Sequence, residues 1–163
     1  MISLRSTFST LLLWTILIVP TQGDAKESSE DIILAVTLNG EVTEFCLDEL
    51  SEMAQTTFTT TTIWTEGEQT FTGVSLHDFL MHLESDAASL RAMAINDYSI
   101  EIPATDATPE GPIIAYMRNG EPMTVRDKGP LWVVYPYDSD PKFQTEEVYF
   151  RSIWQMDRIE ILN

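Results

Sequence analysis

Cysteine, histidine and basic residues are scarce in this sequence of 163 residues. The single cysteine, Cys46, cannot form an internal disulfide, so the fold has to be stabilised by its hydrophobic core. Cys46 ends an apolar stretch, and we expect a buried side chain rather than a reactive thiol. His77 and His82 stand five positions apart, which places them on different faces of a helix and argues against a zinc site built on this pair.

The shortage of bases gives the chain a formal net charge of −17, with nine Lys and Arg against 26 Asp and Glu. Loss of a leader whose one charged side chain is Arg5 would change the net charge to −18. Nucleic acids and anionic membrane surfaces bind proteins through Lys and Arg, so both would repel this molecule. We therefore expect no nucleic-acid partner.

A long hydrophobic run is also missing. The longest, LLLWTILIV at positions 11–19, has nine residues, whereas a membrane-spanning helix needs about 20. Because Arg5 precedes this run and Pro20 and small residues follow it, we predict a cleaved secretory signal at residues 1–23, with an uncleaved anchor as the alternative. Residues 24–31 are polar and predict a flexible tether, and residues 32–163 predict one domain.

The remaining pattern predicts many short strands. Asn-Gly pairs at positions 39–40 and 119–120 separate apolar alternations and are typical of β-hairpin turns, and a strand pair is expected around Asn96 and Asp97. The threonine-rich segment 56–63 predicts an extended strand. Ser75 is expected to cap a helix, and the chain should close with a strand or a helix followed by a strand. The predicted class is α+β with mainly antiparallel strands.

Catalytic motifs are absent from the sequence, which contains no G-x-S-x-G, no H-E-x-x-H and no supported Cys-His pair. Six bases instead fall in a single region, between Arg118 and Arg158, and could hold an anionic or carbonyl-rich ligand. The alternative is that these bases are scattered and paired with acids. The densest element is VRDKGP, in which Arg126 and Lys128 flank an aspartate and a glycine allows close backbone approach.

Two tryptophans and one turn complete the candidate ligand site. Trp64 and Trp154 lie in polar surroundings and could offer flat stacking surfaces, or could be ordinary core aromatics. The turn INDY places Asn96, Asp97 and Tyr98 together, and a carboxylate there could accept two N–H groups of a heterocycle, although Asx residues usually just form turns. The residues alone favour a ligand-binding domain over an enzyme.

Four segments in order, TFTGVSLHDFL, AINDYSIEIP, MRNGEPMTVRDKGPLWVVYP and IWQMDRIEIL, resemble the oxidoreductase molybdopterin-binding domain, which is the fold of sulfite oxidase. The resemblance covers nearly all of residues 32–163. In catalytic members, the strand before the G-V-x-L helix carries a cysteine whose thiolate binds molybdenum. Here that position falls among Thr60, Thr61 and Thr62, whose neutral hydroxyls are poor substitutes for a soft ligand.

The resemblance therefore implies a subgroup of short, exported, cysteine-less pterin-binding proteins without catalysis. Some such members act as periplasmic pterin receptors that pair with an inner-membrane enzyme of cyclic di-GMP metabolism and so control biofilm formation. The implied roles are stacking on the pterin by Trp64 or Trp154, acceptance of its N–H groups by Asp97, and contact with its carbonyl by Arg126, Lys128 or Arg151. No metal is expected.

Two alternatives stay open at this point. The chain could be a molybdenum-cofactor oxidoreductase that holds the metal through an unusual oxygen ligand or binds the cofactor through its pterin alone. It could also be a periplasmic interaction module that has lost ligand binding.

Overall fold

The computed structural model describes residues 31–163. The predicted signal peptide (1–23) and all of the predicted tether (24–31) except Asp31 lie outside the described residues. Within residues 31–163, no helix is long and apolar enough to cross a membrane.

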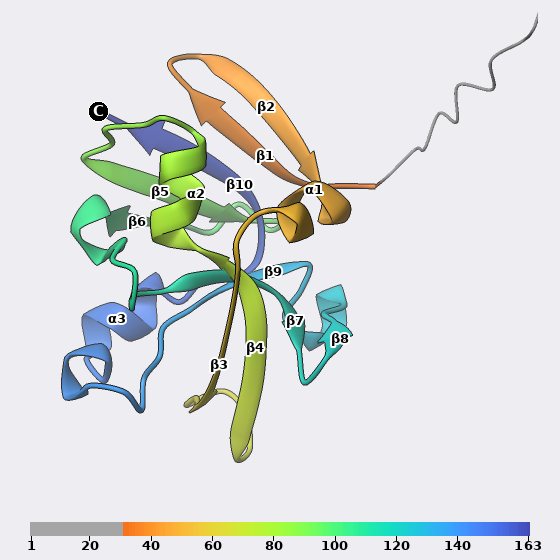
Figure 1. Ribbon diagram of the computed structural model, residues 1–163, viewed down its shortest axis with the longest axis vertical. Coiled ribbons are helices and arrows are strands. Elements are labelled where there is room, and N and C mark those ends of the chain that lie inside the picture. The colour runs from red at the N-terminus through yellow and green to blue at the C-terminus, as the bar shows by residue number, and fades with distance from the viewer. Residues whose placement is uncertain (1–30) are drawn as a thin grey trace, which may run out of the picture.

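Within residues 31–163, ten strands form one branched sheet, and three short α-helices and three 3-10 helices lie in its connections (Figure 1). The strands are β1 (Ile32–Leu38), β2 (Glu41–Cys46), β3 (Gln55–Thr61), β4 (Glu68–Ser75), β5 (Ser89–Ala94), β6 (Ser99–Pro103), β7 (Ile113–Arg118), β8 (Glu121–Pro122), β9 (Leu131–Val134) and β10 (Trp154–Leu162). The helices are α1 (Leu47–Glu52), α2 (Leu76–His82), α3 (Glu146–Arg151), η1 (Ala104–Asp106), η2 (Val125–Asp127) and η3 (Pro141–Phe143).

The main path of the sheet runs β2-β1-β10-β9-β7-β4-β3, with β5 and β6 branching from β10 and β8 from β7. All pairings in the described sheet are antiparallel except that of β1 with β10. The predicted α+β class with mainly antiparallel strands is thus confirmed. β10 is the central strand, because it pairs with β1, β5 and β9 and so joins the two ends of the molecule.

The turns and caps follow from local chemistry. Asn39 and Gly40 both have positive φ, as do Asn119 and Gly120, which is the geometry that two-residue hairpin turns require. The Ser75 hydroxyl accepts a hydrogen bond from the Asp78 N–H at 2.9 Å and caps α2, as predicted. Cys46 is buried and caps α1, where its sulfur accepts from the Glu49 N–H at 3.5 Å. Its predicted burial is confirmed.

Gly73 allows β4 and β7 to approach closely at a register shift. A β-carbon at this position would lie 2.1 Å from the carbonyl oxygen of Ile114, which is far inside contact distance. Any other residue would therefore push β7 away from β4. The close packing of β4 against β7 thus explains why glycine occupies this position of the G-V-x-L segment.

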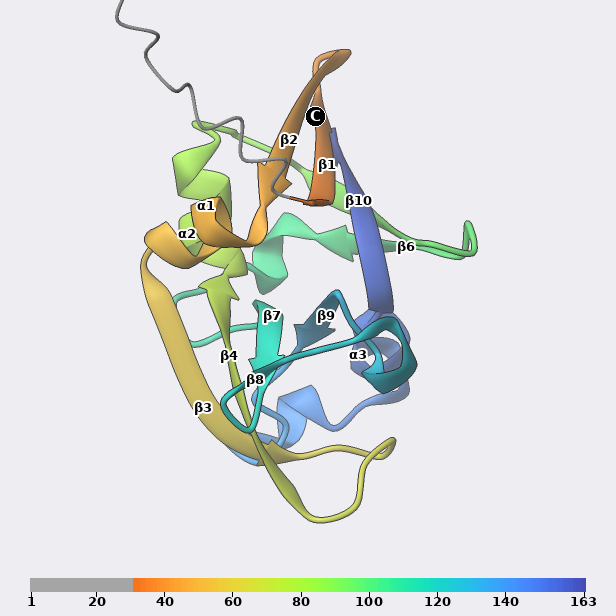
Figure 2. The same cartoon turned by 90° about the vertical axis from the view of Figure 1, so that its right-hand side faces the viewer.

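Aromatic side chains fill the part of the core beneath β9. Phe71, Trp132, Tyr135 and Tyr137 are each at most 2% exposed, and β9 itself is buried along its whole length. The β3–β4 loop reaches toward the side of the molecule that carries α3 (Figure 2). A contact between the rings of Trp64 and Tyr149, whose centroids are 5.8 Å apart, joins this loop to α3.

Candidate ligand-binding site

The threonine-rich strand ends in a clamp on the carboxylate of Asp138. The Thr61 N–H and hydroxyl and the Thr60 hydroxyl all donate to this carboxylate, and the Asp138 N–H donates back to Thr60 Oγ1 at 3.1 Å. These bonds, first among them the one from the Thr61 backbone, hold the pKa of Asp138 below its ordinary value. The clamp ties the end of β3 to the segment that follows β9.

Thr62 then turns the chain toward Trp64. Its hydroxyl accepts from the Trp64 N–H at 3.1 Å and is bonded to the Thr65 hydroxyl at 2.8 Å. The strand predicted to reach Ile63 therefore ends at Thr61, because Thr62 offers the backbone a turn in place of the next strand pairing. All three threonine hydroxyls at this position are thus already engaged in hydrogen bonds.

A bulge in β10 sets the direction of Trp154. The register of β10 shifts at residues 154–156 against β9 and at residues 156–158 against β5, and Gln155 adopts the left-handed conformation with φ 51°. Its N–H donates to the Lys128 carbonyl at 2.9 Å, its carbonyl accepts from the Ile95 N–H at 3.0 Å, and its side-chain amide donates to the Val125 carbonyl at 2.7 Å. Bulges re-aim side chains, and this one turns Trp154 toward the cavity.

Helix α3 is held in place by two polar networks. Arg151 donates to Asp106 at 3.1 Å, and the Tyr135 hydroxyl donates to the same carboxylate at 2.7 Å. Burial, and next the bond to Asp106, raises the pKa of Tyr135 well above its ordinary value, so the phenol remains a donor. At the end of the helix, Ser152 Oγ accepts from the Tyr137 hydroxyl at 2.6 Å, and its carbonyl accepts from the Trp132 indole at 3.2 Å.

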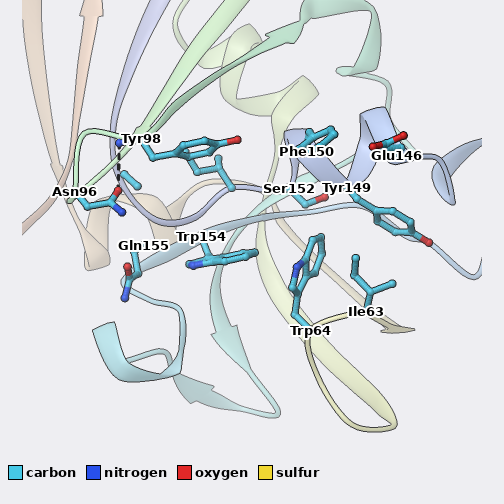
Figure 3. A pocket seen from close by; sticks show the side chains of 12 residues that line it. Ile63, Trp64, Asn96, Tyr98, Glu146, Tyr149, Phe150, Ser152, Trp154 and Gln155 are labelled. Carbon is cyan, nitrogen blue, oxygen red and sulfur yellow. Dashed lines mark hydrogen bonds between the residues drawn. The ribbon is translucent and has the colours of Figure 1, made fainter.

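These elements surround a cavity of about 560 Å³. It is lined by residues from the β3–β4 loop, the β5–β6 hairpin, α3 and the start of β10 (Figure 3): Ile63, Trp64, Ala94, Asn96, Tyr98, Glu146, Tyr149, Phe150, Ser152, Ile153, Trp154 and Gln155. The volume lies within the range of about 300–1,000 Å³ that small-molecule sites occupy.

Five of the twelve residues that line the cavity are aromatic. The centroid of Trp64 lies 5.3 Å from that of Trp154 and 5.8 Å from that of Tyr149, both in edge-to-face geometry, and Trp132 packs behind them. Figure 3 shows Tyr98 and Phe150 across the cavity from the two tryptophans. Such walls favour a flat, largely apolar ring system.

The amide and carboxylate side chains of the lining lie at the two ends of the cavity. Asn96 and Gln155 lie at one end, and Glu146 lies at the other, beyond Phe150 (Figure 3). Glu146 is the one charged residue among those that line the cavity. Lys128 stands behind the wall, with its ammonium 4.5 Å from the centroid of Trp154, and this cation–π contact helps to fix the ring.

Four of the residues predicted from the sequence, Trp64, Asn96, Tyr98 and Trp154, are brought together as lining of this cavity. Lys128 reaches the site only through the ring of Trp154. No motif or periodicity marks the six-residue helix or the bulge, so four lining residues were not predicted: Glu146, Tyr149, Phe150 and Gln155.

The other predicted residues do not line the cavity. The Asp97 carboxylate accepts from Arg158 at 3.0 Å, and Arg151 is paired with Asp106. Arg126 is exposed, in the loop whose Val125 carbonyl is bound by Gln155. Asp97 and Arg151 therefore have structural partners of their own.

The region rich in bases is largely neutralised. Four of its six members form an ion pair with a carboxylate within 4 Å: Arg118 with Asp127, Lys142 with Asp140, Arg151 with Asp106, and Arg158 with Asp97. Within residues 31–163, only Arg126 and Lys128 of this region lack such a partner. Most of these bases are thus paired with acids, which was the alternative to a ligand site.

Known proteins share this fold. The family model described as oxidoreductase molybdopterin binding domain matches residues 41–138. The structure is similar to the crystal structure of the sulfane dehydrogenase SoxCD from Paracoccus pantotrophus, with a TM-score of 0.60 and 18% sequence identity, over 82% of this chain and 38% of that chain. At this identity the likeness shows the fold alone. No curated protein sequence matches the chain.

We predict that Asp138→Asn lowers the free energy of unfolding at neutral pH. The free energy of unfolding of this variant should also change less with pH at acidic pH. The pKa of Asp138 is lower in the folded state than in the unfolded state, where it is about 4. The ionised carboxylate therefore adds to the free energy of unfolding above about pH 4, and this addition is lost as the pH falls through the folded-state pKa. Because the clamp is exposed, the loss should stay below about 1 kcal/mol. Urea unfolding at several pH values measures it.

The matched control is Asp86→Asn, because within residues 31–163 the Asp86 side chain forms no hydrogen bond or ion pair. Equal acid dependence in the wild type and Asp138→Asn would show that the clamp does not stabilise the fold.

Proposed function

Since the chain belongs to the oxidoreductase molybdopterin-binding domain family, we propose that its aromatic cavity binds a pterin ring without ligating molybdenum, and that the protein is a non-catalytic periplasmic receptor. The observation that carries the proposal is the cavity itself, with tryptophan and tyrosine walls, polar ends and no basic lining residue. A pterin is flat and apolar on its faces and carries hydrogen-bonding groups on its edges, so it matches this distribution.

The side chains next to the cavity do not fit a molybdenum centre. The hydroxyls of Thr60, Thr61 and Thr62, at the place of the family's cysteine, are engaged by Asp138, Thr65 and the Trp64 N–H. Cys46 caps α1 and is not among the lining residues. Among residues 31–163, no group of three or more His, Cys, Asp or Glu side chains is placed to hold a metal ion.

The phosphate of a complete molybdopterin also fits poorly. The one charged lining residue is the acidic Glu146, and the nearby Lys128 is occupied over Trp154. A phosphate in the cavity would therefore meet a like charge and no direct cation. A neutral pterin avoids this cost, because a buried charge without a partner is strongly unfavourable.

The proposed partner is the periplasmic domain of a membrane-bound enzyme that makes or degrades cyclic di-GMP, as the resemblance to exported pterin receptors implies. The support in the structure is an apolar rim. Exposed hydrophobic side chains gather at the cavity mouth and beside it, with exposed fractions of 43–63%: Ile63, Ile95, Tyr98, Val125 and Phe150. Exposed apolar clusters of this kind are typical of ligand or protein contacts.

We predict that protein purified after export of the full chain carries pterin and no stoichiometric molybdenum. Elemental analysis of the intact protein and mass spectrometry of small molecules released on denaturation measure both quantities. Near-stoichiometric molybdenum would refute the proposal and favour an oxidoreductase with atypical metal ligation. Failure of every pterin to raise the melting temperature of the protein would favour an interaction module without ligand.

For the partner, we predict that Ile95→Glu abolishes the effect of the protein on cellular cyclic di-GMP while pterin binding is retained. Ile95 is 43% exposed beside the cavity but does not line it, so a charge there should disturb docking and leave the cavity intact. Met81→Glu is the control, since Met81 is also an exposed hydrophobic residue, at 67%, but lies on α2. An unchanged cyclic di-GMP level after deletion of the gene would contradict this role.

A further inference from the structure

Among the described residues, Glu146 is the one charged side chain at the wall of the cavity. Its carboxylate lines the cavity, and within residues 31–163 it forms no hydrogen bond or ion pair. Its neighbour Glu147, by contrast, lies 3.8 Å from the Arg151 guanidinium and does not line the cavity. Of the two adjacent carboxylates, only Glu146 is therefore available to a bound molecule.

The aromatic walls decide how a flat ligand presents itself to this carboxylate. Glu146 lies at one end of the cavity, beyond Phe150 (Figure 3), so a flat ring stacked along the aromatic walls would present an edge to this end. At the opposite end, Asn96 Oδ1 accepts from the Tyr98 N–H, and the Gln155 amide donates to Val125. The two ends thus differ, with an acceptor-only carboxylate at one and amides held by the backbone at the other.

A carboxylate accepts hydrogen bonds and cannot donate them, so the edge that faces Glu146 must carry N–H groups. Two parallel N–H donors suit it best, since they form the same two-bond fork that a guanidinium forms with a carboxylate. In a 2-amino-4-oxo-pteridine, the ring N3–H and the 2-amino group are adjacent and form such a pair. A 2,4-dioxo-pteridine places a carbonyl oxygen there instead, which a carboxylate repels.

Resting on the proposed pterin binding, we infer that Glu146 is the specificity-determining residue of the cavity and selects ring systems with a 2-amino-4-oxo-pyrimidine edge. A pterin, which is a 2-amino-4-oxo-pteridine, is then bound with this edge at α3 and the opposite edge toward Asn96 and Gln155. This role replaces the one that the sequence suggested for Asp97, whose carboxylate is held by Arg158.

The test compares two ligands, pterin and lumazine (2,4-dioxo-pteridine), on three proteins: the wild type, Glu146→Gln and Glu147→Gln. Glutamine keeps the size of the side chain but removes the charge and adds a donor. Dissociation constants come from fluorescence titration of the purified full chain after removal of bound small molecules. Thermal unfolding shows whether each variant is folded.

We expect the wild type to bind pterin at least about tenfold more tightly than lumazine, because hydrogen bonds to a charged group are the strong ones. Glu146→Gln should weaken pterin binding by about tenfold or more and reduce or reverse the preference, since its amide can donate to the lumazine carbonyl. Glu147→Gln should behave as the wild type.

The failures of the two proposals are distinguishable. Wild-type protein that binds neither ring would refute pterin binding itself, and with it this inference. Wild-type protein that binds both rings equally, or Glu146→Gln protein that retains the wild-type preference, would overturn the role of Glu146 and leave pterin binding intact.

Discussion

The backbone of Gln155 holds together the segments that meet at the cavity. Its N–H and carbonyl bind Lys128 and Ile95, and its side chain binds Val125, so one residue joins β10 to the loop before β9 and to the β5–β6 hairpin. A left-handed conformation costs a residue with a β-carbon about 1–3 kcal/mol. Three hydrogen bonds, each contributing about 0.5–1.5 kcal/mol, are of the right size to offset this strain.

The direction of Trp154 depends on this bulge. In a regular strand, residues 154 and 155 would point to opposite faces of the sheet, whereas both side chains here line the same cavity. Lys128, whose carbonyl accepts from Gln155, also places its ammonium over Trp154. The bulge and the aromatic wall thus shape this site.

The end of the threonine-rich strand β3 supports the cavity through hydrogen bonds within the protein. The hydroxyls of Thr60 and Thr61 donate to Asp138, and the hydroxyl of Thr62 accepts from the Trp64 N–H in the turn. The segment therefore positions an aromatic wall of the cavity. Fold and function are separable in this way because a binding site needs only a few side chains on a common scaffold.

Local signals in the sequence predicted local structure well. The Asn-Gly turns and the Ser75 cap depend on neighbouring residues, and both agree with the structure. The convergence of Trp64 and Trp154, which are 90 positions apart, was accessible only through the resemblance and not from any local pattern.

What the sequence did not reveal depends on contacts between distant segments. Asp97 pairs with Arg158, and Arg151 with Asp106, at separations of 61 and 45 residues. No spacing rule indicates such pairs, so bases that looked like a ligand site turned out to be neutralised. Glu146 was missed because a six-residue helix is too short to show an amphipathic period.

The most direct test of the central claim is a crystal structure of the protein with bound pterin, collected with anomalous data at the molybdenum edge. We expect a fused ring between the tryptophans and Phe150, one edge of the ring at Glu146, and no anomalous peak beside Thr60–Thr62. A pterin bound outside this cavity, or a molybdenum peak at the threonines, would contradict it.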